Sequence, residues 1–342
     1  MTNRLQEMYN FGVKRTDLFY STVLSDRTGA NVYVKREDLQ ENKSFKIRGA
    51  VNNMLSKIKE ENSNNNKRIF ACASTGNHAQ GVAMACAKMQ KKGIIFMPKI
   101  ASQVKIDKTK YFGKEFVEIK LVGDNFDECL EIANKQVKEN GYCFIHPYDD
   151  IFTIEGQSSV MEEVFLQLKD KNKNCDLVFS PVGGGGLISG IINVVEKYNM
   201  DTKVIGCQTE LCHPLTKSLK NNINIESDIE KKEVITDGSL VKKLGNLTWN
   251  IMNDAYKNNK FSVEVLENDK VLYCIGLAKT EHNIDVEGAG ALSFAGFLQY
   301  AKNNNVKNKN VVLINSGGNI LQEMQQRAVG CYKNNSFEKV FG

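Results

Sequence analysis

The sequence predicts an α/β protein with more than one mostly parallel sheet. Short apolar, β-branched segments alternate with longer amphipathic segments along nearly the whole chain. The strand-like segments are continuously apolar, which is typical of parallel sheets covered by helices on both faces. Seven segments are expected to form strands, most of them followed by a helical pattern: 31–35, 68–73, 93–97, 116–122, 176–182, 203–208 and 310–315.

Length and composition agree with a globular protein of two domains. The chain has 342 residues, and one domain takes about 150 residues. Hydrophobic residues make up 42% and charged residues 25%, which leaves ample material for a core and excludes a disordered, collagen-like or small disulfide-rich protein. The net charge of +5 is too weak to predict binding to nucleic acid or to a membrane.

Cysteine usage and the N-terminal segment predict a cytoplasmic protein. The nine cysteines include no CxxC pair, and the first 20 residues lack the pattern of a signal peptide. We therefore expect reduced, mostly buried thiols. No run approaches the roughly 18 apolar residues of a membrane span. Cys207, Cys212 and His213 form the only close Cys/His set, but their spacing is not that of a zinc site, and we expect no metal site.

Four polar segments rich in Asn and Lys are expected to be surface connections. The first of them precedes the strand at 68–73, where the chain could cross between domains. The segments are 61–67, 169–174, 217–232 and the pair 303–305 and 307–310.

The first of four chemically informative segments is SFKIRGA, residues 44–50, which contains Lys46. A lysine behind an aromatic residue at a helix start can be a desolvated amine that attacks carbonyl groups. The alternative is an ordinary surface lysine.

The second segment is STGNHAQG, residues 74–81, which follows a strand and opens a helix. Free backbone N–H groups at a helix N-terminus suit a carboxylate or a phosphate. The alternative is a plain helix cap formed by Ser74 or Thr75.

The third segment is PVGGGGLISG, residues 181–190, again a strand, a glycine run and a helix. Four glycines in a row let several backbone N–H groups approach one anion. The spacing is neither GxGxxG nor GxxxxGK[ST], so a phosphate cup is favoured over a dinucleotide or nucleoside triphosphate site.

The fourth segment is INSGGNI, residues 314–320, which places Ser316 at the carboxyl end of a strand. Open α/β sheets bind ligands at that edge, although Ser316 alone could also be a turn residue. A reactive amine, two anion-binding helix starts and a lone hydroxyl together indicate a phosphorylated aldehyde cofactor held as a Schiff base.

The chain resembles the fold type II pyridoxal-phosphate enzymes, specifically the threonine dehydratase and serine racemase group. The motifs that carry the resemblance occur in the order KREDLQ with SFKIRGA, STGNHAQG, PVGGGGLISG and SGGN. The resemblance extends over nearly the whole chain and includes DNFDECLEIA, IHPYDD, VIGCQTE, DGSLVKKLGNLTW and VEGAGAL. It implies a fold like that of the tryptophan synthase β subunit, with two three-layer α/β domains. It also implies pyridoxal 5'-phosphate as cofactor and a homodimer or homotetramer.

The resemblance also implies roles for particular residues. Lys46 holds the cofactor aldehyde, with Phe45 beside the ring; Asn77 bonds the ring 3-oxygen, and Ser316 faces the pyridine nitrogen. A serine there cannot keep that nitrogen protonated as an aspartate would, which favours elimination over transamination. The phosphate lies on Gly183, Gly184, Gly185, Gly186 and Leu187. The substrate side comprises Ser74, Thr75, Gly76, Asn77 and His78, which grip the carboxylate, and Glu287 near the cofactor face.

The reaction implied is dehydration of an L-hydroxyamino acid. Lys46 removes the α-proton, the β-hydroxyl leaves, and threonine gives 2-oxobutanoate and ammonia while serine gives pyruvate and ammonia. The alternatives are a serine racemase with side elimination, an ammonia-lyase for 3-hydroxyaspartate or diaminopropionate, and a weakly catalytic cofactor carrier.

Three departures from the family pattern bear on these alternatives. Thr75 stands where racemases have serine and dehydratases usually have alanine, which leaves racemisation open. Gln208 and Pro214 match acidic cation ligands of serine racemases, so that site is expected to be lost. Segment 155–159 reads EGQSS where the family usually has AGQGT.

The domain organisation implied is discontinuous. We expect a large cofactor-binding domain from residues 1–66 and 142–342, and a small inserted α/β domain from 67–141. The resemblance places the cofactor in the cleft between them, which closes over the substrate. Since the chain ends soon after SGGN, it resembles the short, catabolic type of dehydratase without a regulatory domain.

Overall fold

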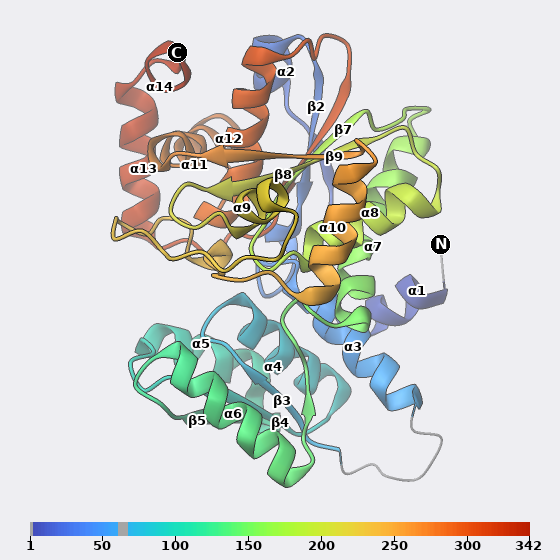
Figure 1. Cartoon of the computed structure of the whole chain (residues 1–342), viewed down its shortest axis with the longest axis vertical. Coiled ribbons are helices and arrows are strands. Elements are labelled where there is room, and N and C mark those ends of the chain that lie inside the picture. The colour runs from blue at the N-terminus through green and yellow to red at the C-terminus, as the bar shows by residue number, and fades with distance from the viewer. Residues whose placement is uncertain (1–2, 61–67) are drawn as a thin grey trace. The chain divides into compact units, whose positions relative to one another are not determined.

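The computed structural model describes residues 3–60 and 68–342, so the predicted connection at 61–67 lies outside the described residues. The chain forms two compact units, one from Met1–Arg15 and Gln40–Gln157 and the other from Thr16–Leu39 and Ser158–Gly342. Figure 1 follows the elements along the chain.

The first unit contains a four-stranded parallel sheet in the order β5-β4-β3-β6. The strands are β3 (Phe70–Ala73), β4 (Gly93–Met97), β5 (Val117–Leu121) and β6 (Cys143–Phe144). The helices are α1 (Asn3–Asn10), α3 (Lys46–Glu60), α4 (Asn77–Met89), α5 (Gln103–Gly113), α6 (Phe126–Asn140) and the start of α7 (Ile151–Lys169), with the 3-10 turn η2 (Lys114–Phe116).

Alternation along β3 divides the core of this unit between the two faces of its sheet. Phe70 and Cys72 pack in one cluster with residues of α3 and α4. Ala71 and Ala73 pack in another cluster with residues of α6, because successive side chains of a strand point to opposite faces. Helices therefore cover both faces, as the continuous apolar strands predict (Figure 1).

The second unit contains a six-stranded sheet in the order β1-β2-β10-β7-β8-β9. Only β1 is antiparallel to its neighbour. The strands are β1 (Leu18–Tyr20), β2 (Asn31–Arg36), β7 (Leu177–Pro181), β8 (Lys203–Thr209), β9 (Phe261–Leu266) and β10 (Asn310–Asn315). Leu177, Phe179 and Leu313 pack in the main core with residues of α11 and α12.

The remaining elements also belong to this unit, and α8 packs with α10 and with β7. They are α2 (Thr22–Thr28), η1 (Glu37–Leu39), α8 (Gly186–Lys197), α9 (Pro214–Asn221), η3 (Asp237–Ser239), α10 (Asn246–Lys257), α11 (Asn268–His282), α12 (Gly288–Asn303), α13 (Gln322–Asn334) and α14 (Phe337–Phe341). α7 ends in this unit.

All seven predicted strands are present, and the mostly parallel α/β class is confirmed. The sequence interpretation omits β1, β6 and β9; β1 and β6 are very short, and β9 lies at a sheet edge with only its two end residues buried. The expectation of a surface connection at 217–221 is wrong. These residues finish α9, because Pro214 starts that helix and its buried face includes Leu215 and Ser218.

The predicted insertion, 67–141, lies inside the first unit, which extends beyond it on both sides. The helix α3 packs on α4, and Gly156 of α7 lies against Gly49 of α3. The helices α3 and α7, which lie on either side of segment 67–141 in the sequence, therefore pack in the unit that contains the four-stranded sheet. The division at 67–141 stays a prediction.

Two other expectations concern the chain as a whole. The cysteines are free thiols, and all except Cys143 and Cys331 are buried, as the sequence indicates. Among the described residues, no helix is both long and apolar enough to cross a membrane.

Candidate active site

The first unit places the Lys46 amine against a backbone carbonyl. Lys46 is the first residue of α3, and its Nζ donates to the Pro147 carbonyl oxygen at 2.9 Å. The same nitrogen lies 5.2 Å from the centre of the Phe45 ring. Both side chains are half-buried. This burial argues against the alternative that Lys46 is an ordinary surface lysine.

Close backbone packing holds the first turn of α3 on two sides. A Cβ at Gly81 of α4 would lie 3.1 Å from both the Ile47 nitrogen and the Lys46 carbonyl carbon. A Cβ at Gly156 of α7 would lie 2.6 Å from the Arg48 carbonyl oxygen. Because any larger residue would push these helices apart, the two glycines fix the main chain from which the Lys46 side chain extends.

The helix α4 begins behind a glycine. Its first residue is Asn77, and its N-cap residue is Gly76, which has no side chain that could cap the first turn. The Ser74 hydroxyl instead accepts from the Gly76 N–H at 3.1 Å. The cap that Ser74 or Thr75 could form is therefore not observed, which favours the anion-binding interpretation of this helix start.

His78 is buried within α4 and bonds to the protein itself. Its Nε2 lies 2.8 Å from the Ile145 carbonyl oxygen, and since a carbonyl only accepts, Nε2 carries the proton. Burial, followed by the charge of Lys46, lowers the pKa of His78 to about 3. The ring is therefore neutral, and its Nε2 is engaged by Ile145.

The second unit places the glycine run at the carboxyl end of β7. Gly185 is the N-cap of α8, with φ of 97° and no side-chain cap. Its Cβ, if present, would lie 2.7 Å from the Met252 methyl carbon, and a Cβ at Gly183 would lie 3.2 Å from the Cα of Ser239. The positive φ and the close contact at Gly185 require glycine, and a side chain at Gly183 would crowd the backbone of Ser239. The N–H groups at the start of α8 suit an anion.

Ser316 lies at the same edge of the sheet as the glycine run. It directly follows β10, which pairs in parallel with β7, and it is 2% exposed. Glu287 supports the same loop: its N–H donates to the Gly317 carbonyl at 2.9 Å, and its Oε2 accepts from the Asn319 N–H at 3.2 Å. The structure thus brings Ser316, Glu287 and the loop around them together.

The predicted site residues fall into two groups by unit. Each group is assembled within its own unit, from segments far apart in the sequence. The first unit contains Phe45, Lys46, Ser74, Thr75, Gly76, Asn77 and His78, and the second contains Gly183, Gly184, Gly185, Gly186, Leu187, Glu287 and Ser316.

Sequence reasoning assigns no role to several residues that support the candidate site. Thr248 of α10 donates its hydroxyl to the Gly184 carbonyl at 2.7 Å, 64 residues away in the chain. Gly81 and Pro147 lie within motifs of the sequence, but the motifs alone indicate no role for them. The resemblance includes the segments around Thr248 and Pro147, but only the folded chain shows what they touch.

The comparisons with known proteins identify the family. A family model described as "Pyridoxal-phosphate dependent enzyme" matches residues 9–317. The chain belongs to this family. It is 38% identical over 330 residues to an L-threonine ammonia-lyase of Thermotoga maritima, covering 96% of this chain and 77% of that protein. It is also 38% identical over 321 residues to a biosynthetic L-threonine dehydratase of Halalkalibacterium halodurans, covering 93% and 74%.

Solved structures of a threonine deaminase and a serine racemase share the fold of this chain. The processed form of threonine deaminase isoform 2 from Solanum lycopersicum superposes with a TM-score of 0.84 at 31% identity, covering 96% of this chain and 91% of that one. Maize serine racemase superposes with a TM-score of 0.82 at 24% identity, covering 97% and 96%. At that identity the likeness to the racemase is one of fold.

The residues present fit pyridoxal phosphate, the cofactor of the family. The side chain of Lys46 ends in a primary amine, the group with which an aldehyde would react, and its main chain is fixed by close packing. The glycine run supplies an uncapped helix start whose shape a Cβ would destroy. Pyridoxal phosphate is therefore the cofactor of this protein.

Gln208 and Pro214, which match cation ligands of serine racemases, have structural roles within the protein. The Gln208 Oε1 accepts from the Thr216 N–H at 3.1 Å and from its hydroxyl at 3.2 Å, and Pro214 begins α9. Across residues 3–60 and 68–342, no three His, Cys, Asp or Glu side chains form a group able to hold a metal ion.

Replacing Thr248 by valine tests whether its hydroxyl supports the glycine run. Loss of the bond to the Gly184 carbonyl should raise the dissociation constant for pyridoxal phosphate about tenfold. The matched control is Thr202→Val, which removes an equally short bond to the Cys175 carbonyl near the opposite end of β7. Both variants should lose similar stability, but only Thr248→Val should bind the cofactor more weakly; equal binding by both would contradict the assignment.

Treatment with a chelator tests the cation positions. Ammonia release from threonine should be unchanged by EDTA, because Gln208 is engaged by Thr216 and proline offers no side-chain ligand. Added Mg²⁺ or Ca²⁺ should leave both the rate and the melting temperature unchanged. A marked rise in either would show that a cation site is retained.

Proposed function

We propose that this protein is a pyridoxal-phosphate-dependent ammonia-lyase that converts L-threonine to 2-oxobutanoate and ammonia, and L-serine to pyruvate and ammonia. The observation that carries the proposal is 38% identity to an L-threonine ammonia-lyase over 96% of the chain. The fixed amine of Lys46 supports it, because α-proton removal needs a positioned base.

The cofactor, when bound, supplies the electron sink that stabilises negative charge at the substrate Cα. Lys46 would hold the cofactor between turnovers and would act as the general base that takes the α-proton on its Nζ. The Pro147 carbonyl accepts a hydrogen bond from that nitrogen and so gives the free amine a defined place. Ser316 offers the ring nitrogen a neutral hydroxyl instead of a fixed negative charge.

The remaining predicted residues bind the two anionic groups. The uncapped start of α4, with Ser74 to His78, receives the substrate carboxylate on its backbone N–H groups. Because the His78 ring is bonded to Ile145, His78 contributes to carboxylate binding through its backbone N–H and through the packing of its side chain. The start of α8, Gly183 to Leu187, would hold the cofactor phosphate on its backbone N–H groups. Phe45 and Asn77 would contact the cofactor ring. Glu287 holds the loop that follows Ser316.

Serine racemisation is the second candidate activity. Thr75 carries a hydroxyl directly before the Gly76 N-cap, and it is half-buried. A racemase needs an acid or base on the face of the substrate opposite Lys46, and a hydroxyl at this position is the feature that favours it. Chiral analysis of serine after incubation with the protein separates the two activities.

We further propose that the protein acts in the cytoplasm as a homodimer or homotetramer. Reduced, mostly buried thiols support the cytoplasm. The oligomeric state is supported by the family resemblance.

The function is tested by assaying ammonia and 2-oxo acid release from L-threonine, L-serine, D-serine and 3-hydroxyaspartate, with Lys46→Ala beside the unchanged protein. Lys46→Ala should lose the visible absorbance band of the lysine-bound cofactor, and ammonia release should fall roughly a thousandfold or more. The control Lys59→Ala removes an exposed lysine of the same helix that pairs with Glu7, and it should leave both unchanged.

Two results would contradict the proposal. One is a Lys46→Ala variant that keeps the absorbance band and the ammonia release. The other is a cofactor-loaded protein that releases ammonia from neither threonine nor serine.

A further inference from the structure

His146 lies beside Lys46 but has no part in the chemistry described above. It is half-buried in the segment between β6 and α7. Its Nδ1 accepts two backbone hydrogen bonds, from the Asp149 N–H at 2.7 Å and from the Tyr148 N–H at 3.3 Å. The imidazole therefore closes a tight turn of its own backbone.

That turn contains the carbonyl group that binds the Lys46 amine. Pro147 follows His146 directly, and its carbonyl oxygen accepts from Lys46 Nζ at 2.9 Å. Because the peptide bond is planar, fixing the Tyr148 N–H on the imidazole also fixes the direction of the Pro147 carbonyl in the same peptide unit. The two hydrogen bonds to Nδ1 thus orient the acceptor for Lys46.

The arrangement requires a neutral imidazole. A nitrogen that accepts from two N–H groups presents its lone pair, so the proton of the neutral ring lies on Nε2. If Nδ1 took a proton it would become a donor facing two donors, and the turn would lose both bonds.

Titratable groups of the His146 segment, of α3 and of α4 interact with His146. Asp149 and Asp150 lie in its own segment and raise its pKa, while Lys46 and Lys57 of α3 lower it. The buried ring of His78 on α4 is also close enough to interact with it electrostatically. Burial is the largest effect, and the net result is that the pKa of His146 is lowered from 6.5.

We propose that His146 is a positioning residue for Lys46: its neutral imidazole orients the Pro147 carbonyl against the Lys46 amine, and its protonation at acid pH removes that support. The inference rests on the proposed function of Lys46 as the base. It assigns the acid limit of the activity to a residue outside the predicted cofactor-binding and substrate-binding residues.

The direction of the pH effect follows from the lowered pKa. The folded protein keeps His146 neutral below pH 6.5, where the unfolded chain already takes up the proton. Stability from the neutral ring is therefore present above pH 6.5 and is lost as the pH falls through the folded-state value. Activity that depends on the same ring should fall in that same acid range.

The test compares His146→Asn with His146→Leu in the cofactor-loaded protein. The asparagine Oδ1 can accept in place of Nδ1 but does not titrate, so kcat at alkaline pH should stay within about threefold and the acid fall in kcat should disappear or move to lower pH. Leucine cannot accept, so kcat should fall roughly ten- to a hundredfold while KM for threonine changes by less than about threefold.

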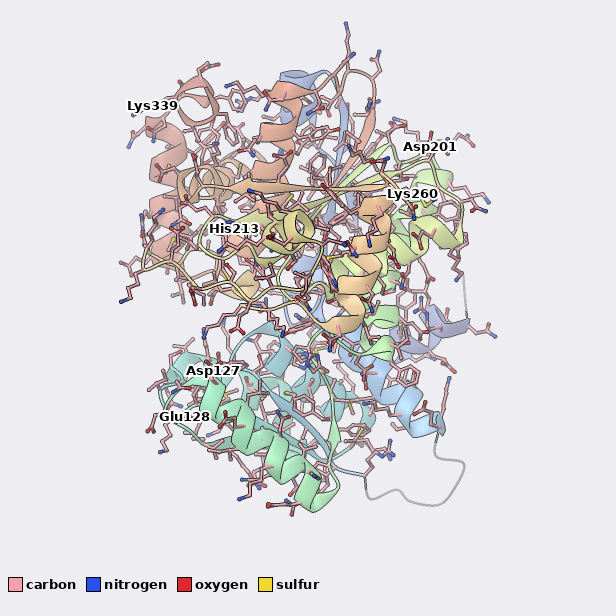
Figure 2. All side chains as sticks on the ribbon, viewed as in Figure 1. Asp127, Glu128, Asp201, His213, Lys260 and Lys339 are labelled. Atoms are coloured by element: carbon pink, nitrogen blue, oxygen red, sulfur yellow. The ribbon has the colours of Figure 1, made fainter. Side chains whose placement is uncertain are left out.

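The control is His213→Asn, which changes the N-cap histidine of α9 in the second unit (Figure 2). It should keep the kcat and the pH profile of the unchanged protein. Melting temperatures confirm that each variant is folded, and if the leucine variant does not fold, the asparagine variant still carries the test through its pH profile.

Three results would overturn the inference, and they differ from those that overturn the function. Each of them would show that His146 does not position Lys46. They are an asparagine variant with an unchanged acid fall in kcat, a leucine variant with normal kcat, and a leucine variant altered only in KM. If the protein released no ammonia from threonine or serine, the proposed function would fail. The pH dependence of the cofactor absorbance band, compared between the unchanged protein and His146→Asn, would still test His146.

Discussion

The parallel pairing of β10 with β2 on one side and β7 on the other organises the second unit. Residues near the end of the chain thereby form a central strand of the sheet, with Asn315 opposite Arg36 and Leu313 opposite Phe179. Parallel strands end at a common edge, so the loops that follow β7 and β10 have to lie together. The proposed phosphate loop and Ser316 share an edge for this reason.

Buried polar contacts then fix the direction in which the β10 loop leaves the sheet. The Asn315 Nδ2 donates to the Asp38 carboxylate at 2.8 Å and to the Asp285 carbonyl at 3.2 Å, while Glu287 binds the backbone on the other side of Ser316. Asp38 is itself bonded to Arg36. A neutral hydroxyl is thus held in place by charged side chains, which orient Ser316 through its neighbouring backbone.

Much of this arrangement can be predicted from local sequence, and the rest depends on contacts between distant residues. Lys46, the glycine run and Ser316 are recognisable because each lies where an apolar strand-like or helix-like pattern begins or ends. The Pro147 carbonyl lies 101 residues from Lys46 in the chain, and Thr248 lies 64 residues from Gly184, so no local pattern joins them. Backbone acceptors carry no residue identity, which is why the partner of the lysine amine could not be inferred.

The central claim is that Lys46, of all the lysines in this chain, holds the cofactor. Reduction of the pyridoxal-phosphate-loaded protein with borohydride, followed by proteolysis and mass spectrometry, measures this directly because the reduced bond survives digestion. We expect the cofactor mass on the peptide that contains Lys46, in near-stoichiometric yield. Modification of a different lysine, or none at all in a protein that releases ammonia from threonine, would contradict the account.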